Sequence, residues 1–337
     1  MLSEPRERDF EPVPPRSPRV EYRAVPSVSV PENVLAVVRF GEPAQIEAAE
    51  RLTVGVGLTP VGELAPDTIW CAAGPVASGQ RENIRFAHDA DSLFGVIEVR
   101  EANYPDIRTA TTAVYRAIDE FQRSSAFPYL LRMWNFIDAV NEGDGDLERY
   151  RQFCVGRAEG FGESLRTGYP AATAIGRQQP SGLIQVFWIA ARTPGTPVEN
   201  PRQISAYRYP RTHGPVSPSF SRATVLADGT LLISGTASIV GHASQHPNDW
   251  AAQLAETLRN LDSFIAHARQ HGDPVAAEAE MLLTVYIRER GHEDAIAERI
   301  RTAFPNARTM FVVADICRRE LLLEIECVVQ PASRAKD

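Results

Sequence analysis

Two carboxylates near the C-terminus stand in a pattern that suits proton transfer. Glu324 and Glu326 belong to an apolar run, residues 321–326, and side chains two residues apart on a strand point to the same face. A carboxyl group with apolar neighbours holds its proton more tightly, so its pKa rises toward neutrality and it can act as a general acid. We therefore expect one of these glutamates to point into a cleft.

Other kinds of chemistry are excluded by the residue types present. Lys336 is the single lysine, so neither a lysine Schiff base nor a phosphate-loop lysine is available. His242 and His246 have the spacing of two metal ligands on a helix, but Pro247 follows at once and no third ligand is evident. We expect neither a metal ion nor an organic cofactor.

Composition limits the partners and the location. The formal net charge is -8 and no basic stripe occurs, which argues against nucleic-acid binding. No run of about 18 apolar residues is present, so no membrane span is expected. The cysteines form no CxxC pair and the first residues lack the apolar core of a signal peptide, which predicts a reducing cytoplasm.

In the first half of the chain, the hydrophobic pattern predicts a helix, a strand and a second helix. Pro105 is suited to a helix start, and an apolar stripe with spacings of three and four follows it: Ile107, Thr111, Val114, Ile118 and Phe121. The strand is predicted over residues 129–137 and the second helix over about 146–163. Strand-like segments precede them at 34–39, 83–87 and 93–100.

The second half repeats this order about 150 residues later. Residues 247–249 supply a helix start, Gly272 offers a stop, and an apolar stripe lies between: Leu254, Leu258, Leu261 and Ile265. The elements that follow are a strand over 281–287, a helix over about 293–302, and strands near 309–314 and 321–329. Strand-like segments again come first, at 222–226 and 231–235.

The repeated order predicts an α+β fold with two domains in tandem, residues 33–200 and 201–337. Each domain is expected to be a mixed sheet covered on one face by two helices, and 337 residues suit two domains. Residues 1–32 carry prolines at positions 5, 13, 14, 15, 18, 26 and 31, which disfavours helices and sheet ladders. We expect this Pro-rich arm to pack on the surface or to stay loose.

Two family resemblances appear at this point. The second half, from Trp250 to the run 321–326, resembles the RidA/YjgF family of small trimeric proteins, whose ligand sites lie in clefts between neighbouring domains. Residues 207–215, 217–223 and 234–242, together with 314–321 and Glu324, resemble the chorismatase family, whose members carry a RidA-like domain pair over nearly the whole chain. The resemblance implies a ligand cleft within one chain, so we expect a monomer; the alternative is a duplication that serves stability alone.

The chorismatase resemblance implies a substrate and roles for particular residues. Chorismate carries two carboxylates, and its enolpyruvyl side chain would leave as pyruvate after Glu324 protonates the methylene carbon. Substrate binding is assigned to four side chains: Tyr150, Arg157, Tyr209 and Arg222. A planar guanidinium can hold a carboxylate by two parallel hydrogen bonds, and Tyr150 and Arg157, seven residues apart, share one helix face.

Each of these residues could instead have a purely structural role. Glu324 could be a structural carboxylate paired with Arg318 or Arg319, and for Glu326 we favour a structural role. An arginine is most often a solvated surface charge. The motif match favours a substrate-binding role for Arg157 and Arg222 only. Arg211 could support the site without contacting the substrate. Gly214, Gly235 and Gly241 are interpreted as positions that permit tight turns near a ligand.

Ala237 and Cys317 match the positions that tune the product within the family. Cys317 agrees with members that make 3-hydroxybenzoate, whereas Ala237 agrees with members that hydrolyse the side chain to a dihydroxycyclohexadiene carboxylate. This mixed pair resembles the branch that makes both 3- and 4-hydroxybenzoate, which we favour over the hydrolase. Two further hypotheses are hydrolysis of imines or enamines and a non-catalytic ligand-binding module.

Overall fold

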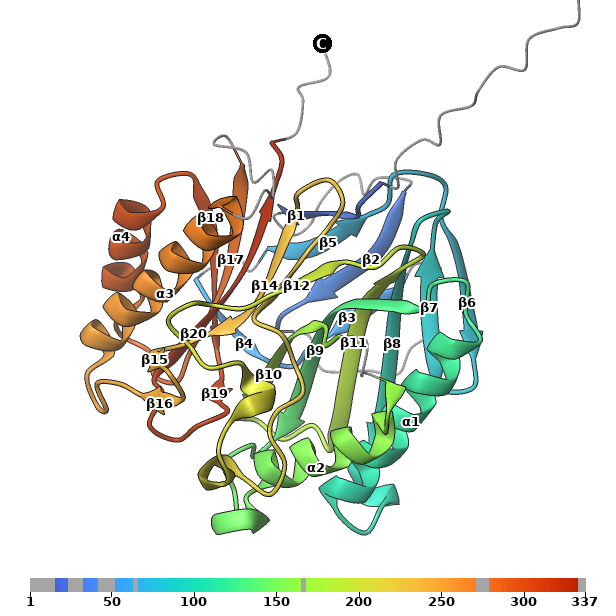
Figure 1. The fold of residues 1–337 in the computed structure, drawn as a ribbon, viewed down its shortest axis with the longest axis horizontal. Coiled ribbons are helices and arrows are strands. Elements are labelled where there is room, and N and C mark those ends of the chain that lie inside the picture. The colour runs from blue at the N-terminus through green and yellow to red at the C-terminus, as the bar shows by residue number, and fades with distance from the viewer. Residues whose placement is uncertain are drawn as a thin grey trace, which may run out of the picture.

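Three β-sheets pack around a shared apolar centre, and each of the two larger sheets carries a pair of α-helices on its outer face (Figure 1). The structure is a computed structural model that describes residues 16–23, 33–41, 52–62, 66–164, 168–270 and 279–332. Its mixture of sheets and helices confirms the predicted α+β class. Along the described ranges, no helix combines the length and the apolar character needed to cross a membrane.

The first large sheet holds most of the first half of the chain. Its strand order is β19-β10-β9-β11-β8-β7-β6. The strands are β6 (Ala77–Arg81), β7 (Ile84–His88), β8 (Ser92–Arg100), β9 (Tyr129–Asp138), β10 (Ala171–Arg177), β11 (Leu183–Ala191) and β19 (Asp315–Ile316). Its helices are α1 (Ile107–Arg123) and α2 (Arg149–Phe161). The predicted helix, strand and helix are confirmed, with α2 beginning three residues later than expected because a short 3-10 turn (Gly145–Leu147) precedes it.

The second large sheet has the order β12-β13-β14-β20-β17-β18-β4. Its strands are β4 (Thr59–Val61), β12 (Thr196–Val198), β13 (Ala223–Val225), β14 (Leu231–Thr236), β17 (Glu280–Ile287), β18 (Ala307–Val313) and β20 (Leu323–Gln330). Its helices are α3 (Trp250–Gln270) and α4 (Glu293–Ala303). The helix start at Asp249 is confirmed, since its side chain accepts a hydrogen bond from the Ala252 amide; the predicted stop at Gly272 lies outside the described residues.

The two large sheets repeat one topology. The order β8-β11-β9-β10 in the first sheet corresponds to β14-β20-β17-β18 in the second, with the helices inserted at equivalent points of the chain. Each sheet also borrows an edge strand from the other half, because β19 pairs with β10 and β4 pairs with β18. These exchanged strands join the halves through backbone hydrogen bonds. The division into domains at residue 200, and a RidA-like character for each half, stay predictions.

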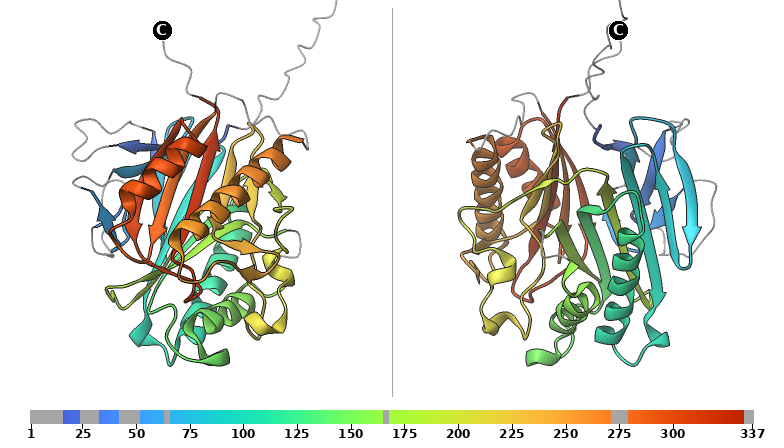
Figure 2. Two further views of the ribbon diagram at one scale, coloured as in Figure 1. Left: turned by 90° about the vertical axis from the view of Figure 1, so that its left-hand side faces the viewer. Right: turned by 45° about the vertical axis from the view of Figure 1, so that its right-hand side comes forward.

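A small sheet lies against the helix-free side of the large sheets (Figure 2). It consists of β1 (Arg19–Arg23), β2 (Val34–Arg39), β3 (Thr53–Gly55) and β5 (Asp67–Cys71). Strand β1 falls within the predicted Pro-rich arm, where we expected no sheet ladder. The five residues of β1 lie between Pro18 and Pro26 and contain no proline, so they can pair with β5. The rest of the arm lies mostly outside the described residues.

Helix α2 is held close to α1 by two glycines. A Cβ atom at Gly156 would come within 2.4 Å of the Arg108 carbonyl oxygen, and one at Gly160 within 2.5 Å of the Tyr115 Cβ. The helix begins at Arg149, whose guanidinium donates to the Asp138 carbonyl oxygen over 3.1 Å and to both carboxylate oxygens of Glu101. The close packing of α2 on α1 and the hydrogen bonds of Arg149 therefore set the position of the side chains on α2.

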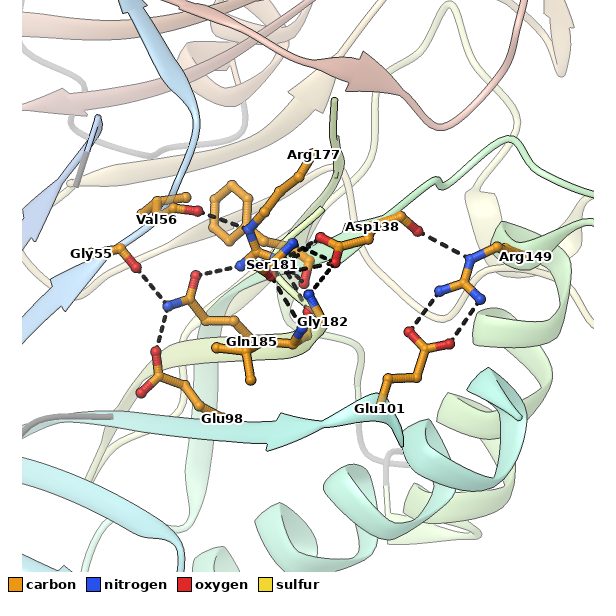
Figure 3. A network of polar contacts seen from close by, with 12 residues as sticks. Gly55, Val56, Glu98, Glu101, Asp138, Arg149, Arg177, Ser181, Gly182 and Gln185 are labelled. Atoms are coloured by element: carbon orange, nitrogen blue, oxygen red, sulfur yellow. Dashed lines mark hydrogen bonds and ion pairs between the residues drawn. The ribbon is translucent and has the colours of Figure 1, made fainter. Parts of the chain in front are cut away.

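A buried arginine joins the first large sheet to the small sheet (Figure 3). Arg177 is 1% exposed, and its guanidinium donates to five groups, which belong to Val56, Phe136, Asp138, Leu183 and Gln185. The amide of Gln185 in turn donates to the Gly55 carbonyl oxygen over 2.8 Å. The network satisfies polar groups that would otherwise be buried without partners.

We predict that Arg177→Met lowers the free energy of unfolding by about 3 to 5 kcal/mol, because it leaves the buried Asp138 carboxylate without its cation. Urea unfolding followed by tryptophan fluorescence measures the effect. Arg116→Met is the matched control, since Arg116 is exposed on α1, and it should change stability by less than about 0.5 kcal/mol. Equal unfolding midpoints for the two variants would show that the network contributes nothing.

Candidate active site

A cavity of about 390 Å³ opens where α2, β10, β14 and the start of β20 meet the chain segment that precedes β13. This volume is in the range of small-molecule sites. All seven site residues predicted from the sequence line it: Tyr150, Arg157, Tyr209, Arg222, Ala237, Cys317 and Glu324. They come from segments up to 174 residues apart in sequence, so tertiary structure brings them together.

Glu324 lies at the bottom of the cavity wall formed by β20. It is 5% exposed, and its carboxyl group makes no hydrogen bond or ion pair with any residue that the structure describes. Burial raises its pKa to about 8, and the nearby negative charge of Glu326 raises it further against three arginines. A carboxyl group in this state holds its proton at neutral pH and can donate it.

The alternative pairing of Glu324 with Arg318 or Arg319 is not found. Arg318 donates to the His242 carbonyl oxygen over 2.9 Å, and its guanidinium lies 5.3 Å from the centre of the Tyr209 ring. Arg319 donates to backbone carbonyl groups at Asn141 and Gly143. Both arginines line the cavity, but each is held by other partners.

Gly235 makes room for the carboxyl group of Glu324. A Cβ atom at position 235 would lie 1.8 Å from Oε1 of Glu324 and 2.7 Å from its Cδ. The ladder between β14 and β20 shifts register between Ile233 and Thr236, so Gly235 sits at an irregularity in a strand. The interpretation of Gly235 as a turn residue was therefore wrong; it is a close-approach glycine. Gly214 and Gly241 do have positive φ angles, 144° and 59°.

Arg157 is a buried cation without an anionic partner in the described structure. It is 3% exposed, and its guanidinium lies 5.1 Å from the Tyr115 ring centre and 5.9 Å from that of Phe161. Its polar contact within the described structure is weak, 3.7 Å from Nη2 to the Met133 sulfur, and Nε has no hydrogen-bond partner among the described residues. Burial of an unpaired charge is costly unless a ligand supplies the opposite charge.

Arg222 repeats this arrangement on another wall. It is 4% exposed, donates through Nη2 to the Tyr209 hydroxyl and the Ile204 carbonyl oxygen, and its Nε has no hydrogen-bond partner among the described residues. The Glu199 carboxyl group lies near this guanidinium, whose charge opposes the rise that burial causes in the pKa of Glu199. The Phe220 ring centre lies 5.2 Å from its guanidinium. Neither Arg157 nor Arg222 forms an ion pair within the described ranges, so two positive charges face one cavity. The arrangement fits a small molecule that carries negative charge.

Ala237 and Cys317 face the same space, with Ala237 2% exposed. Burial, and then the nearby Glu324, raise the pKa of the Cys317 thiol. The thiol is therefore protonated at neutral pH and is a hydrogen-bond donor or an apolar wall rather than a nucleophilic thiolate. Burial likewise holds the pKa of the Tyr150 hydroxyl above its ordinary range.

Several lining residues escaped the sequence analysis. Thr173 on β10 and Ser219 before β13 line the cavity, and the Ser219 hydroxyl is buried without a partner. Strand β10 was not predicted, so nothing marked Thr173, whereas Ser219 lies in the segment 217–223 that carries the family resemblance but was not chosen as a site residue. Arg211, in contrast, forms an exposed ion pair with Asp146 and does not line the cavity.

His213, which lines the cavity, pairs with His242. Their ring nitrogens, Nε2 and Nδ1, lie 2.9 Å apart. Burial and the positive charge of Arg318 lower the pKa of His213 to about 4, so His213 is neutral at physiological pH. His246 lies beside Glu256 instead, 3.4 Å away.

Known proteins are similar to this chain in sequence. A family model described as "Chorismatase FkbO/Hyg5-like, N-terminal" matches residues 68–190. A 3-hydroxybenzoate synthase of Streptomyces hygroscopicus is 34% identical over 333 residues, which cover 91% of this chain and 94% of the relative. A chorismatase of Streptomyces rapamycinicus is 38% identical over 277 residues, 77% of this chain and 81% of the relative.

A solved structure agrees with these relatives. The crystal structure of a chorismatase superimposes with a TM-score of 0.84 at 32% identity, covering 94% of this chain and 99% of that one. The matches to the 3-hydroxybenzoate synthase and to the solved chorismatase extend over more than nine tenths of this chain and so include parts of both halves. The chain belongs to the chorismatase family.

Proposed function

We propose that this enzyme cleaves the enolpyruvyl group of chorismate, releasing pyruvate together with 3-hydroxybenzoate, 4-hydroxybenzoate or both. One observation carries the proposal: a buried carboxyl group that is protonated at neutral pH shares a cavity with two buried guanidinium groups that have no carboxylate partner in the described structure. The names of the relatives, 3-hydroxybenzoate synthase and chorismatase, supply the substrate.

Binding follows from charge. The two carboxylates of chorismate offer the anions that Arg157 and Arg222 lack, each in the planar geometry that a guanidinium matches. The Tyr209 hydroxyl accepts a hydrogen bond from Arg222 and so helps to orient it, and Tyr150 lines the wall on the α2 side. Desolvation of the cavity strengthens both ion pairs once substrate is bound.

Catalysis follows from the proton on Glu324. Transfer of that proton to the methylene carbon of the enolpyruvyl group creates an oxocarbenium-like centre, and Glu324 becomes a carboxylate that stabilises the positive charge. The ring hydroxyl oxygen can then attack the neighbouring ring carbon and break its bond to the ether oxygen, which leaves as the carbonyl oxygen of pyruvate. Loss of a ring proton makes the ring aromatic, and one proton returns to Glu324. Chorismate and the sum of hydroxybenzoate and pyruvate have the same atoms, so no second reactant is needed.

Hydrolysis is the second candidate, favoured by Ala237 alone. In this reaction water attacks the activated side chain, and the ring product is the dihydroxycyclohexadiene carboxylate. Cys317 and Ala237 lie on one cavity with Glu324, where either can determine which nucleophile reaches the reacting carbon. The enzyme is proposed to act as a monomer in the cytoplasm, which the single-chain cavity and four free cysteines support.

Glu324→Gln keeps the shape of the side chain and removes its proton. We expect turnover to fall about 10²- to 10⁴-fold because general-acid catalysis is lost, while chorismate still binds in calorimetry. Pyruvate release in a coupled assay measures turnover. Glu320→Gln is the control, since Glu320 lines the same cavity but is exposed and accepts a hydrogen bond from Ser244; it should change turnover by a few-fold at most. Equal turnover in the two variants would remove Glu324 as the acid.

The pH profile tests the same carboxyl group. Its folded-state pKa is raised to about 8, and a general acid works in the protonated form, so kcat/KM should be constant below pH 8 and fall tenfold per unit above it. Bound dianion should raise the pKa further, which places the corresponding limb of kcat at higher pH. A profile that rises through pH 8 would contradict the assignment of Glu324 as an acid.

Product separation after incubation with chorismate decides between the two reactions. We expect aromatic hydroxybenzoates from the wild-type enzyme and, for Cys317→Ala, less 3-hydroxybenzoate in favour of the diene diol. Cys154→Ala, which changes another thiol that lines the cavity, is the control for volume. A wild-type enzyme that forms the diene acid without any aromatic product would make it a hydrolase.

A further inference from the structure

Glu326 is held behind the cavity by three donors. Its Oε2 accepts hydrogen bonds from Nη2 of Arg132 over 2.8 Å, from the Trp134 indole nitrogen over 3.1 Å and from the Thr173 hydroxyl over 2.9 Å. The side chains of Glu326 and Arg132 are 12% and 2% exposed. The donors lie on β9 and β10 of the first large sheet, whereas Glu326 belongs to β20 of the second. The contact is therefore a fixed bridge between the sheets.

This bridge continues to the residue that makes room for Glu324. The Gly235 amide donates to the same Thr173 hydroxyl over 3.0 Å. One hydroxyl thus connects the carboxylate of Glu326 with the irregular part of β14, where a Cβ would strike the Glu324 carboxyl group. The position of Gly235, and with it the space for the acid, depends on the hydrogen bonds of Glu326.

Glu326 also sets the charge beside the acid. Glu324 and Glu326 lie two residues apart on one face of β20, which places their backbones about 7 Å apart. The negative charge of Glu326 favours the neutral form of Glu324, and the positive charge of Arg132 opposes it. The other titratable or charged groups around Glu324 come from several elements: Tyr150, Arg222, Tyr286, Cys317 and Arg318.

We propose that Glu326 and Arg132 are positioning residues for the reaction, a buried ion pair that holds the β14 irregularity in place through Thr173 and balances the charge beside Glu324. The proposal rests on the proposed role of Glu324 as the acid. It extends the structural role expected for Glu326, because neither member of the pair lines the substrate cavity. Their charges act on Glu324, and their hydrogen bonds reach the cavity wall through Thr173 and Gly235.

Opposite substitutions in the pair test the proposal. Glu326→Gln removes the negative charge and leaves Arg132 uncompensated, so the alkaline limb of kcat/KM should move to lower pH by about one unit. Arg132→Met leaves the negative charge of Glu326 uncompensated, so the limb should move upward by about one unit. The double variant removes both charges and should return the limb close to its wild-type position. Limbs that stay in place, or that move together in one direction, would overturn the proposal.

The hydroxyl bridge provides a test that does not require a buried charge to be removed. Thr173→Val keeps the shape of the side chain and removes the bridge, so we expect kcat to fall at least tenfold with KM within twofold, since the acid is misplaced. Thr173→Ser keeps the hydroxyl and should restore most of kcat. Equal kcat values for the Val and Ser variants would contradict a role for the Thr173 hydroxyl. This test remains valid even if the ion-pair variants fail to fold.

Failure of this inference differs from failure of the proposed function. If Glu324 is not the acid, Glu324→Gln retains turnover whatever the ion pair does. If Glu324 is the acid but Glu326 has a purely structural role, Glu324→Gln loses turnover while the pH limb of Glu326→Gln stays at the wild-type value. Circular dichroism on each variant separates both results from loss of fold.

Discussion

The cavity wall contains two buried guanidinium groups, those of Arg157 and Arg222, that form no ion pair in the described structure, and the rest of the site is built around them. A buried guanidinium normally has a carboxylate partner, because desolvation of a lone charge is costly. Arg132 and Arg177 follow this rule, with Glu326 and Asp138 as partners. Arg157 and Arg222 do not; aromatic rings stack against them, and no carboxylate pairs with either in the described structure. The fold therefore carries a desolvation cost, which the proposed binding of an anionic substrate would relieve.

The carboxyl group of Glu324 stays neutral although positively charged arginines lie near it. Arginines nearby would ordinarily lower the pKa of a carboxyl group, yet burial of Glu324 and the charge of Glu326 outweigh them and raise it to about 8. A proton is therefore available at the pH at which both carboxylates of the substrate are ionised. In the proposed mechanism, substrate binding neutralises the guanidinium groups and raises the pKa of Glu324 further, until the reacting carbon takes the proton.

Small side chains make this arrangement possible. Gly235 admits the Glu324 carboxyl group, and Gly156 lets α2 approach α1 so closely that the neighbouring Arg157 is carried into the cavity wall. The ends of α2 and β9 are joined by Arg149, which connects the Arg177 network to the helix that bears Arg157 (Figure 3). The stability of the sheets and the geometry of the site therefore share the same polar contacts.

The sequence by itself determined the four described α-helices and nine of the twenty described strands, and, through resemblance, a set of residues that lie on one cavity. It did not predict β10 or β11, because β11 is buried along all nine residues and its period-two signal is lost. The exchange of β4 and β19 between the sheets was also invisible, since strands of two or three residues carry no pattern.

Tertiary structure alone decided which charges are compensated. Glu324 and Glu326 look alike in sequence, two acids on one face of an apolar strand. Their difference arises because Arg132, Trp134 and Thr173 reach Glu326 from the other sheet, whereas no described residue reaches Glu324 with a hydrogen bond. Hydrogen bonds across nearly 200 residues of chain depend on how the sheets pack, and local sequence patterns contain no record of that packing.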